Sequence, residues 1–109
     1  MHELGITQEI IAIACERAGG ARVRRIVIVI GKLSAVLPDA VRFCFDLCSD
    51  GTPAEGAALE IIEPPGRASC RDCRAEVFLE GPLGCCKCGS VALDWLSGDE
   101  LAVKELEIT

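Results

Sequence analysis

Eight cysteines give this 109-residue chain most of its chemical potential, and four of them form two Cys-x-x-Cys pairs. The first pair is Cys70 with Cys73, and the second is Cys85 with Cys88. Two such pairs can bring four thiolates to one point, which suits tetrahedral zinc with Zn–S distances of about 2.3 Å. We therefore predict a zinc site at these four residues. Iron, which also accepts four thiolates, and a pair of disulfides or redox thiols are the alternatives.

A fifth cysteine, Cys86, complicates the choice of ligands. Pairing Cys86 with Cys88 gives Cys-x-Cys, a poorer spacing for two ligands on one turn. We therefore choose Cys85 and treat Cys86 as a bystander. Gly89, directly after the last ligand, permits the positive φ that a tight turn needs, whereas Arg74 at the matching place does so less easily.

The single histidine of the chain, His2, stands next to the first residue. The α-amine of Met1, the amide nitrogens of His2 and Glu3 and the imidazole can close adjacent chelate rings on one metal ion. Four nitrogens in a plane suit Ni²⁺ or Cu²⁺. The alternative is a solvated side chain at a loose chain end.

Helices and strands must position these groups. Apolar residues at helical spacing, ended by Gly19-Gly20, predict a helix over about residues 5–18. The β-branched run 23–30 predicts a central strand that is partly buried on both faces. A second helix opens at Pro38, with Val41, Cys44, Leu47 and Cys48 as its apolar stripe. Strands follow at 57–63 and 101–108, and the stretch 77–79 suggests a small hairpin.

The order of these elements predicts an α+β fold in which two helices pack on a three-stranded sheet. The cysteine module is then a small zinc ribbon or knuckle inserted between two strands of that sheet. We place the first domain at residues 1–66 and 97–109 and the zinc domain at 67–96. Cys44 and Cys48 are spaced i, i+4 and could share a metal, but we expect them to pack in the core.

Composition excludes several classes of function. The chain carries 17 acidic and 11 Lys or Arg residues, a net charge of −6, without a basic stripe, which argues against nucleic acid. No signal peptide opens the chain, so clustered Cys-x-x-Cys indicates metal binding in a reducing compartment, the cytoplasm. No apolar run is long enough for a membrane span. We expect no enzymatic activity, because a catalytic pair with a histidine would have to use His2. The alternative function is that of a zinc-ribbon adaptor that docks other molecules.

The chain resembles the HypA/HybF family of nickel metallochaperones. The resemblance rests on Met1-His2-Glu3, the paired Cys-x-x-Cys, the acidic and apolar last strand, and the order of three further segments: IGKLS at 30–34, FCFDL at 43–47 and GTPAEGA at 51–57. It covers essentially the whole chain. One departure is Cys86, which stands where the family commonly has proline.

The resemblance implies a nickel domain of two helices and three strands with a zinc domain inserted before the last strand. It implies nickel at Met1, His2 and Glu3, and zinc at Cys70, Cys73, Cys85 and Cys88. The implied function is delivery of nickel to the large-subunit precursor of [NiFe]-hydrogenase, together with the GTPase HypB. Some relatives also serve urease and its accessory proteins. Whether the chain acts as a monomer or a homodimer stays open.

Overall fold

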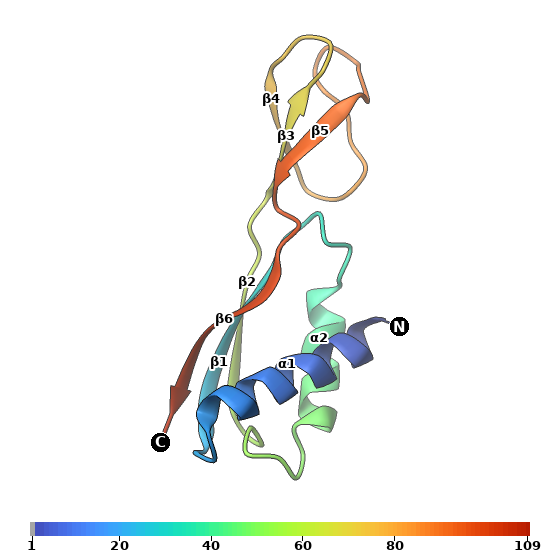
Figure 1. Ribbon diagram of the computed structural model, residues 1–109. Helices are drawn as coiled ribbons and strands as arrows, with labels where there is room; N and C mark the ends of the chain where they lie inside the picture. Colours follow the sequence, from blue (N-terminus) through green and yellow to red (C-terminus); the bar gives the residue numbers. More distant parts are fainter. Residues whose placement is uncertain (1) are drawn as a thin grey trace. The chain divides into compact units, whose positions relative to one another are not determined.

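The computed structural model describes residues 2–109, with His2 described for its backbone alone. Its elements follow one another as two helices and six strands: α1 (His2–Ala18), β1 (Val23–Ile30), α2 (Pro38–Cys48), β2 (Ala58–Ile62), β3 (Gly66–Cys70), β4 (Glu76–Leu79), β5 (Leu93–Ser97) and β6 (Leu101–Ile108) (Figure 1). They form two compact units. The first holds the chain up to Val29, Val36–Ile62 and Ala102–Thr109, and the second holds Ile30–Ala35 and Glu63–Leu101. The predicted α+β class is confirmed.

The first unit has two helices that pack on each other beside a mixed sheet of strand order β2-β1-β6 (Figure 1). β1 lies at the centre, as its β-branched sequence predicts, and runs parallel to β2. Side chains are buried on both of its faces, with Ile26 and Ile28 on one and Val27 on the other. Thr109 donates its backbone N–H to Arg22, so β6 ends beside the start of β1.

The buried face of α2 differs from the predicted stripe. Val41 and Phe45 are the buried residues of this helix, whereas Leu47 is 64% exposed and Phe43 70% exposed. The expectation for Leu47 was therefore wrong. Val41 and Phe45 are four residues apart, so a stripe centred on them rotates Leu47 away from the sheet.

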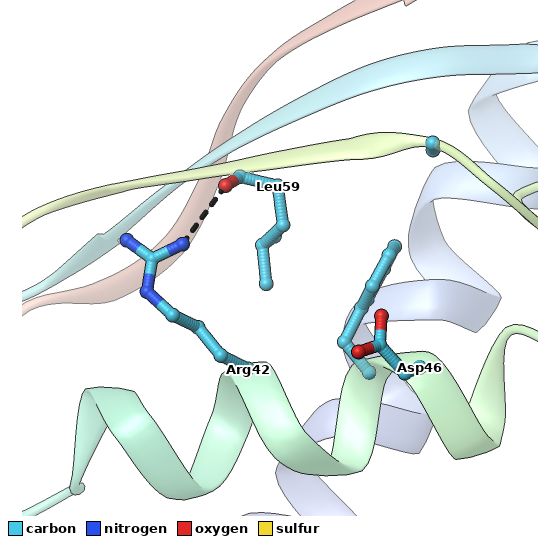
Figure 2. Close-up of a pocket in the computed structure, with 5 residues that line it drawn as sticks. Arg42, Asp46 and Leu59 are labelled. Carbon is cyan, nitrogen blue, oxygen red and sulfur yellow. Dashed lines mark hydrogen bonds between the residues drawn. The ribbon is translucent and has the colours of Figure 1, made fainter.

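A pocket of about 260 Å³ lies between α2 and β2 (Figure 2). Its polar members are Arg42 and Asp46, and Arg42 Nη1 donates to the backbone carbonyl of Leu59 at 3.1 Å. This bond occupies an acceptor of β2, which is an edge strand. An exposed edge carbonyl invites pairing with another chain, so Arg42 protects the edge.

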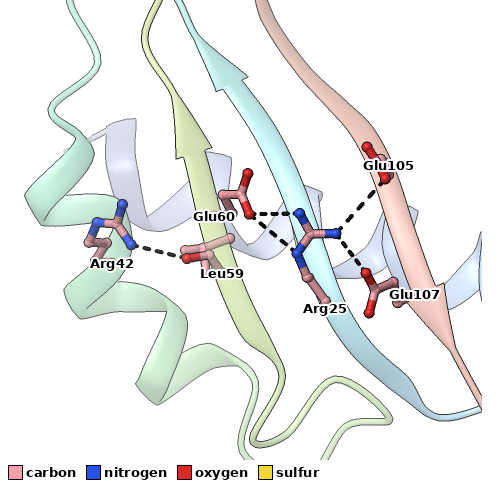
Figure 3. A network of polar contacts seen from close by, with 6 residues as sticks. All are labelled: Arg25, Arg42, Leu59, Glu60, Glu105 and Glu107. Atoms are coloured by element: carbon pink, nitrogen blue, oxygen red, sulfur yellow. Dashed lines mark hydrogen bonds and ion pairs between the residues drawn. The ribbon is translucent and has the colours of Figure 1, made fainter.

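Acidic side chains of the two outer strands converge on Arg25 of the central strand (Figure 3). The guanidinium lies 2.7 Å from Glu60 of β2 and 2.8 Å from Glu107 of β6, with Glu105 at 3.9 Å. Hydrogen bonding to Glu60 raises the pKa of Arg25, although desolvation opposes it. One arginine thus ties all three strands together on this face.

The second unit is a small antiparallel sheet of order β4-β3-β5, with a bulge between Arg67 and Ala68. Only the β4 region was predicted, and β3 and β5 were missed. The core of this sheet consists of Leu33, Ala68 and Leu79, with Val77 and Leu93 packed against it. A core this small cannot hold a domain together without a staple such as a metal ion.

A segment from before α2 belongs to this second unit. The backbone N–H of Gly31 donates to the carbonyl of Glu100, that of Lys32 to Pro64 and that of Leu33 to Gly98. Residues 31–33 therefore bond both to the segment that leads into the insert and to the segment that leads out of it. A Cβ at Gly31 would lie 2.1 Å from the carbonyl oxygen of Gly98, so only glycine fits there. The boundaries expected from the sequence, 67–96 for the insert, did not include this segment.

Within the part of the chain that the structure describes, neither helix has the length and apolar character needed to cross a membrane.

Candidate metal centres

Four sulfurs gather at one end of the small sheet. They belong to Cys70, Cys73, Cys86 and Cys88, and their ligand atoms all lie within 4.8 Å of one another. Cys70 ends β3 and is buried, as is Cys86, while Cys73 and Cys88 are exposed. The pair Cys70 and Cys73 thus contributes one buried and one exposed thiol, and so does the pair Cys86 and Cys88.

Two tight turns position these sulfurs. In the first, Cys70 donates its N–H to Ala75 and accepts the N–H of Arg74, at 2.9 and 2.8 Å. In the second, Cys86 donates to Ser90 and accepts from Gly89 at the same two distances. The residue after the last cysteine of each turn has a positive φ, +92° at Gly89, as predicted, and +64° at Arg74, where a non-glycine residue adopts it.

Hydrogen bonds make the four thiols unequal. The backbone N–H of Cys73, followed by that of Asp72, donates to the sulfur of Cys70 and lowers the pKa of this thiol to about 6 from 9.0. The N–H of Ser90 acts in the same direction on Cys88, but the Cys86 thiol, desolvation and the other thiols raise the pKa of Cys88 to about 12. One sulfur ionises readily while another keeps its proton. A bound divalent cation favours deprotonation of the thiols that coordinate it, and its positive charge allows several thiolates to lie close to one another.

The spacing of the sulfurs fits tetrahedral zinc. With Zn–S near 2.3 Å, two thiolates of a tetrahedral site are about 3.8 Å apart. The Cys70 and Cys88 sulfurs are 3.7 Å apart, and those of Cys73 and Cys86 are 3.5 Å apart. The donor set is also that of structural zinc, four cysteines from two short-range pairs. When bound, zinc would cross-link the two turns.

The cluster differs from the expected ligand set in one residue. Cys85 was expected to be the third ligand and Cys86 a bystander, whereas the structure brings Cys86 to the other sulfurs and leaves Cys85 exposed. The backbone of Cys86 is fixed on both sides, through its N–H and its carbonyl. No rule of spacing in the sequence signals this preference for Cys-x-Cys over Cys-x-x-Cys.

The predicted nickel ligands fall mostly outside the described residues. This is true of Met1 and of the His2 side chain, while the backbone of His2 begins α1. Glu3 is described. Its carboxylate accepts the backbone N–H of Leu37 at 3.1 Å, and its carbonyl accepts the hydroxyl of Thr7 at 2.6 Å. Leu37 is the N-cap residue of α2, so Glu3 joins the starts of the two helices.

The remaining cysteines, Cys15 of α1 and Cys44 and Cys48 of α2, are partly buried and take no part in the four-sulfur cluster.

Fold, cysteine cluster and sequence together define a class of protein. Residues 1–108 match the family described as HypA, hydrogenase/urease nickel incorporation, metallochaperone. This chain belongs to that family. It is a nickel metallochaperone of hydrogenase maturation and no enzyme, with a four-cysteine cluster consistent with a structural zinc site.

Individual relatives agree with this assignment. The hydrogenase maturation factor HypA of Trichormus variabilis is 62% identical over 108 residues, covering 99% of this chain and 96% of that protein. The factor of the same name from Geotalea uraniireducens is 46% identical over 109 residues, 99% of each chain. The solution structure of the Ni metallochaperone HypA from Helicobacter pylori shares the fold. Its TM-score is 0.66 at 24% identity, covering 97% of this chain and 96% of that one.

Proposed function

We propose that this chaperone holds Ni²⁺ at its first three residues. The ligands are the α-amine of Met1, the amide nitrogen and imidazole of His2, and the amide nitrogen of Glu3. The observation that carries the proposal is that α1 begins at His2. The first four N–H groups of a helix have no acceptor within it. The amides of His2 and Glu3 can therefore give up their protons to nickel without breaking any hydrogen bond of the helix.

The role of Glu3 follows from its contacts. Its carboxylate accepts a hydrogen bond from Leu37, in the N-cap position of α2. Glu3 thus contributes its main-chain nitrogen to nickel, while its side chain anchors the metal-binding end of α1 to the start of α2. This division holds the main-chain nitrogen of Glu3 next to the start of α2.

We propose zinc as the resident metal of the cysteine cluster, held by Cys70, Cys73 and Cys88 and by a fourth thiolate from the adjacent pair Cys85 and Cys86. Its function is structural, because it closes two turns on a sheet whose core is small. Binding and folding of such a site are coupled.

We further propose that the recipient is the large-subunit precursor of [NiFe]-hydrogenase and that the GTPase HypB is the partner in delivery, in the cytoplasm. The family description also names urease, so urease accessory proteins are a second possible set of partners. Pull-downs from hydrogenase-producing cells should recover both hydrogenase partners. Failure to recover either, with nickel supplied, would count against this choice.

Nickel titration calorimetry of the untagged protein tests the terminal site. His2→Ala should abolish stoichiometric binding, and an extra residue before Met1 should weaken it strongly, because the α-amine moves away. Glu3→Pro removes the amide proton that nickel must displace, and proline is tolerated in the first turn of a helix. Glu3→Gln is the matched control, since it keeps the amide and should keep nickel.

The zinc content and helical signal of each variant must stay at the wild-type value for the comparison to hold. Unchanged nickel binding in His2→Ala and Glu3→Pro would refute the terminal site. Binding should also weaken in acid, because the α-amine and imidazole, with free pKa values of about 7.7–8.0 and 6.5, must lose their protons.

A further inference from the structure

A site that needs four thiolates has a fifth cysteine next to one of its members in the chain. Three of the cysteines have clear places, namely Cys70, Cys73 and Cys88. The fourth place has two neighbouring candidates, because Cys85 and Cys86 are adjacent in the chain. The structure fills it with Cys86, which is 4% exposed, while Cys85 is exposed to solvent.

The hydrogen bonds of the turn at Cys70 indicate a second way in which the turn at Cys86 could form. The N–H of Cys70 reaches the carbonyl five residues ahead, at Ala75, and the carbonyl of Cys70 accepts from four residues ahead, at Arg74. The corresponding bonds of Cys86 span four residues to Ser90 and three to Gly89. The second turn is thus one residue shorter. With Cys85 in the place of Cys86, it would have the same length and the same bonding pattern as the first.

Both arrangements share the rest of the site. Each uses Cys88 as the last ligand, and each uses the positive φ of Gly89. The segment before the turn, residues 80–85, has no helix or strand whose register would have to slip. A change of ligand therefore needs rearrangement of this segment alone.

One contact favours Cys86. A Cβ at Gly84 would lie 2.6 Å from the Cδ2 atom of Leu79, so the chain passes Leu79 closely only because glycine stands there. This path leads the chain to the cluster with Cys86 as the next buried residue. Bringing Cys85 in requires Gly84 to move away from the side chain of Leu79.

We propose that the zinc centre has two ligand registers, with Cys86 as the resident fourth thiolate and Cys85 as an exchange ligand that can replace it. The inference rests on the proposed zinc site. In the exchange, Cys85 gives its thiol proton to solvent and forms a Zn–S bond, and Cys86 leaves zinc and takes up a proton. The charge and number of thiolates on zinc stay the same. One register or the other always leaves a free thiol beside the metal.

The test compares Cys85→Ser, Cys86→Ser and the double variant as full-length, untagged proteins. Two readouts are used: zinc per chain, and the sulfur-to-cobalt charge-transfer absorption after replacement of zinc by Co²⁺. Each single variant should retain a full equivalent of zinc and the tetrathiolate absorption of the wild type. Cys86→Ser should release zinc to a chelator faster, because its site depends on the less favoured register. The double variant should lose the tetrathiolate absorption.

Loss of zinc, or of the tetrathiolate absorption, in either single variant would overturn the two-register site, and the variant affected would identify the sole fourth ligand. If the wild type itself bound no zinc, the proposed zinc site would fail instead. Tetrathiolate absorption that persists in the double variant would also contradict the inference.

Discussion

The thiol of Cys70 differs from the Cys88 thiol of the same cluster in the pH at which it loses its proton. Hydrogen bonds from the N–H groups of Cys73 and Asp72 lower its pKa to about 6. Above this pH the sulfur is already a thiolate, and zinc binds without displacing its proton. Below it, zinc must displace one more proton, because every thiol ligand is deprotonated in the complex.

We therefore expect zinc affinity to fall more steeply with decreasing pH below about 6 than above it. The slope of log affinity against pH should steepen by about one. Chelator competition at a series of pH values measures this slope. A constant slope across pH 6 would show that the two backbone bonds do not tune Cys70.

At the same scale, the sequence predicted Cys70, Cys73, Cys85 and Cys88 as ligands, whereas the structure gathers Cys86 with Cys70, Cys73 and Cys88. Short-range Cys pairs identify a metal site because few other arrangements place thiols so densely. The choice between Cys85 and Cys86 depends on backbone bonds to Gly89 and Ser90 and on the passage of Gly84 beside Leu79. Those contacts arise only when the sheet has formed, so spacing rules could not predict them.

At the scale of the helices, the contact from Glu3 to Leu37 is the feature to test. Leu37, the N-cap residue of α2, makes no side-chain cap bond, and its own backbone N–H donates to the carboxylate of Glu3 in the other helix. Removing a capping partner costs about 0.5–2 kcal/mol. Glu3→Ala should therefore destabilise the first unit by about 1 kcal/mol while nickel binding is kept, because the amide nitrogen remains.

Urea unfolding of the zinc-loaded protein, followed by the helical circular dichroism signal, measures this change. Glu3→Gln serves as the control, since an amide oxygen can still accept the bond. If Glu3→Ala were as stable as the wild type, the contact would contribute nothing to the start of α2.

Periodicity predicted the helices and the central strand well, because each is long and strongly patterned. It failed on the buried face of α2, where Phe45 is buried and Leu47 exposed. Seven apolar residues in an 11-residue helix allow more than one stripe, and the sheet selects among them. The short strands β3 and β5 were missed because five-residue segments such as GRASC carry little hydrophobic pattern, and because β3 and β5 pair although they lie more than 20 residues apart in the chain.

At the scale of the whole molecule, two compact units are joined in one chain. Both helices belong to the first unit, and the only tryptophan, Trp95, belongs to the second. Each unit thus has its own optical signal. Structural zinc contributes about 10–16 kcal/mol of apparent binding free energy at neutral pH, whereas the hydrophobic core of so small a domain rarely supplies more than about 3–5 kcal/mol.

Removal of zinc by a chelator should therefore unfold the second unit alone. The fluorescence of Trp95 should shift to that of a solvated indole, while the helical signal stays largely unchanged. Cys73→Ala should give the same result without a chelator. Loss of both signals together, or of neither, would contradict the independence of the two units.

The central claim is that the first residues of this chain carry nickel to its recipient, and nickel transfer measures it most directly. Untagged wild type and His2→Ala, both loaded with zinc and exposed to the same nickel, are each incubated with a nickel-free hydrogenase large-subunit precursor. Elemental analysis of the re-isolated precursor should find nickel after incubation with the wild type and only the background level after incubation with His2→Ala. Equal nickel in the precursor from both proteins would contradict the account.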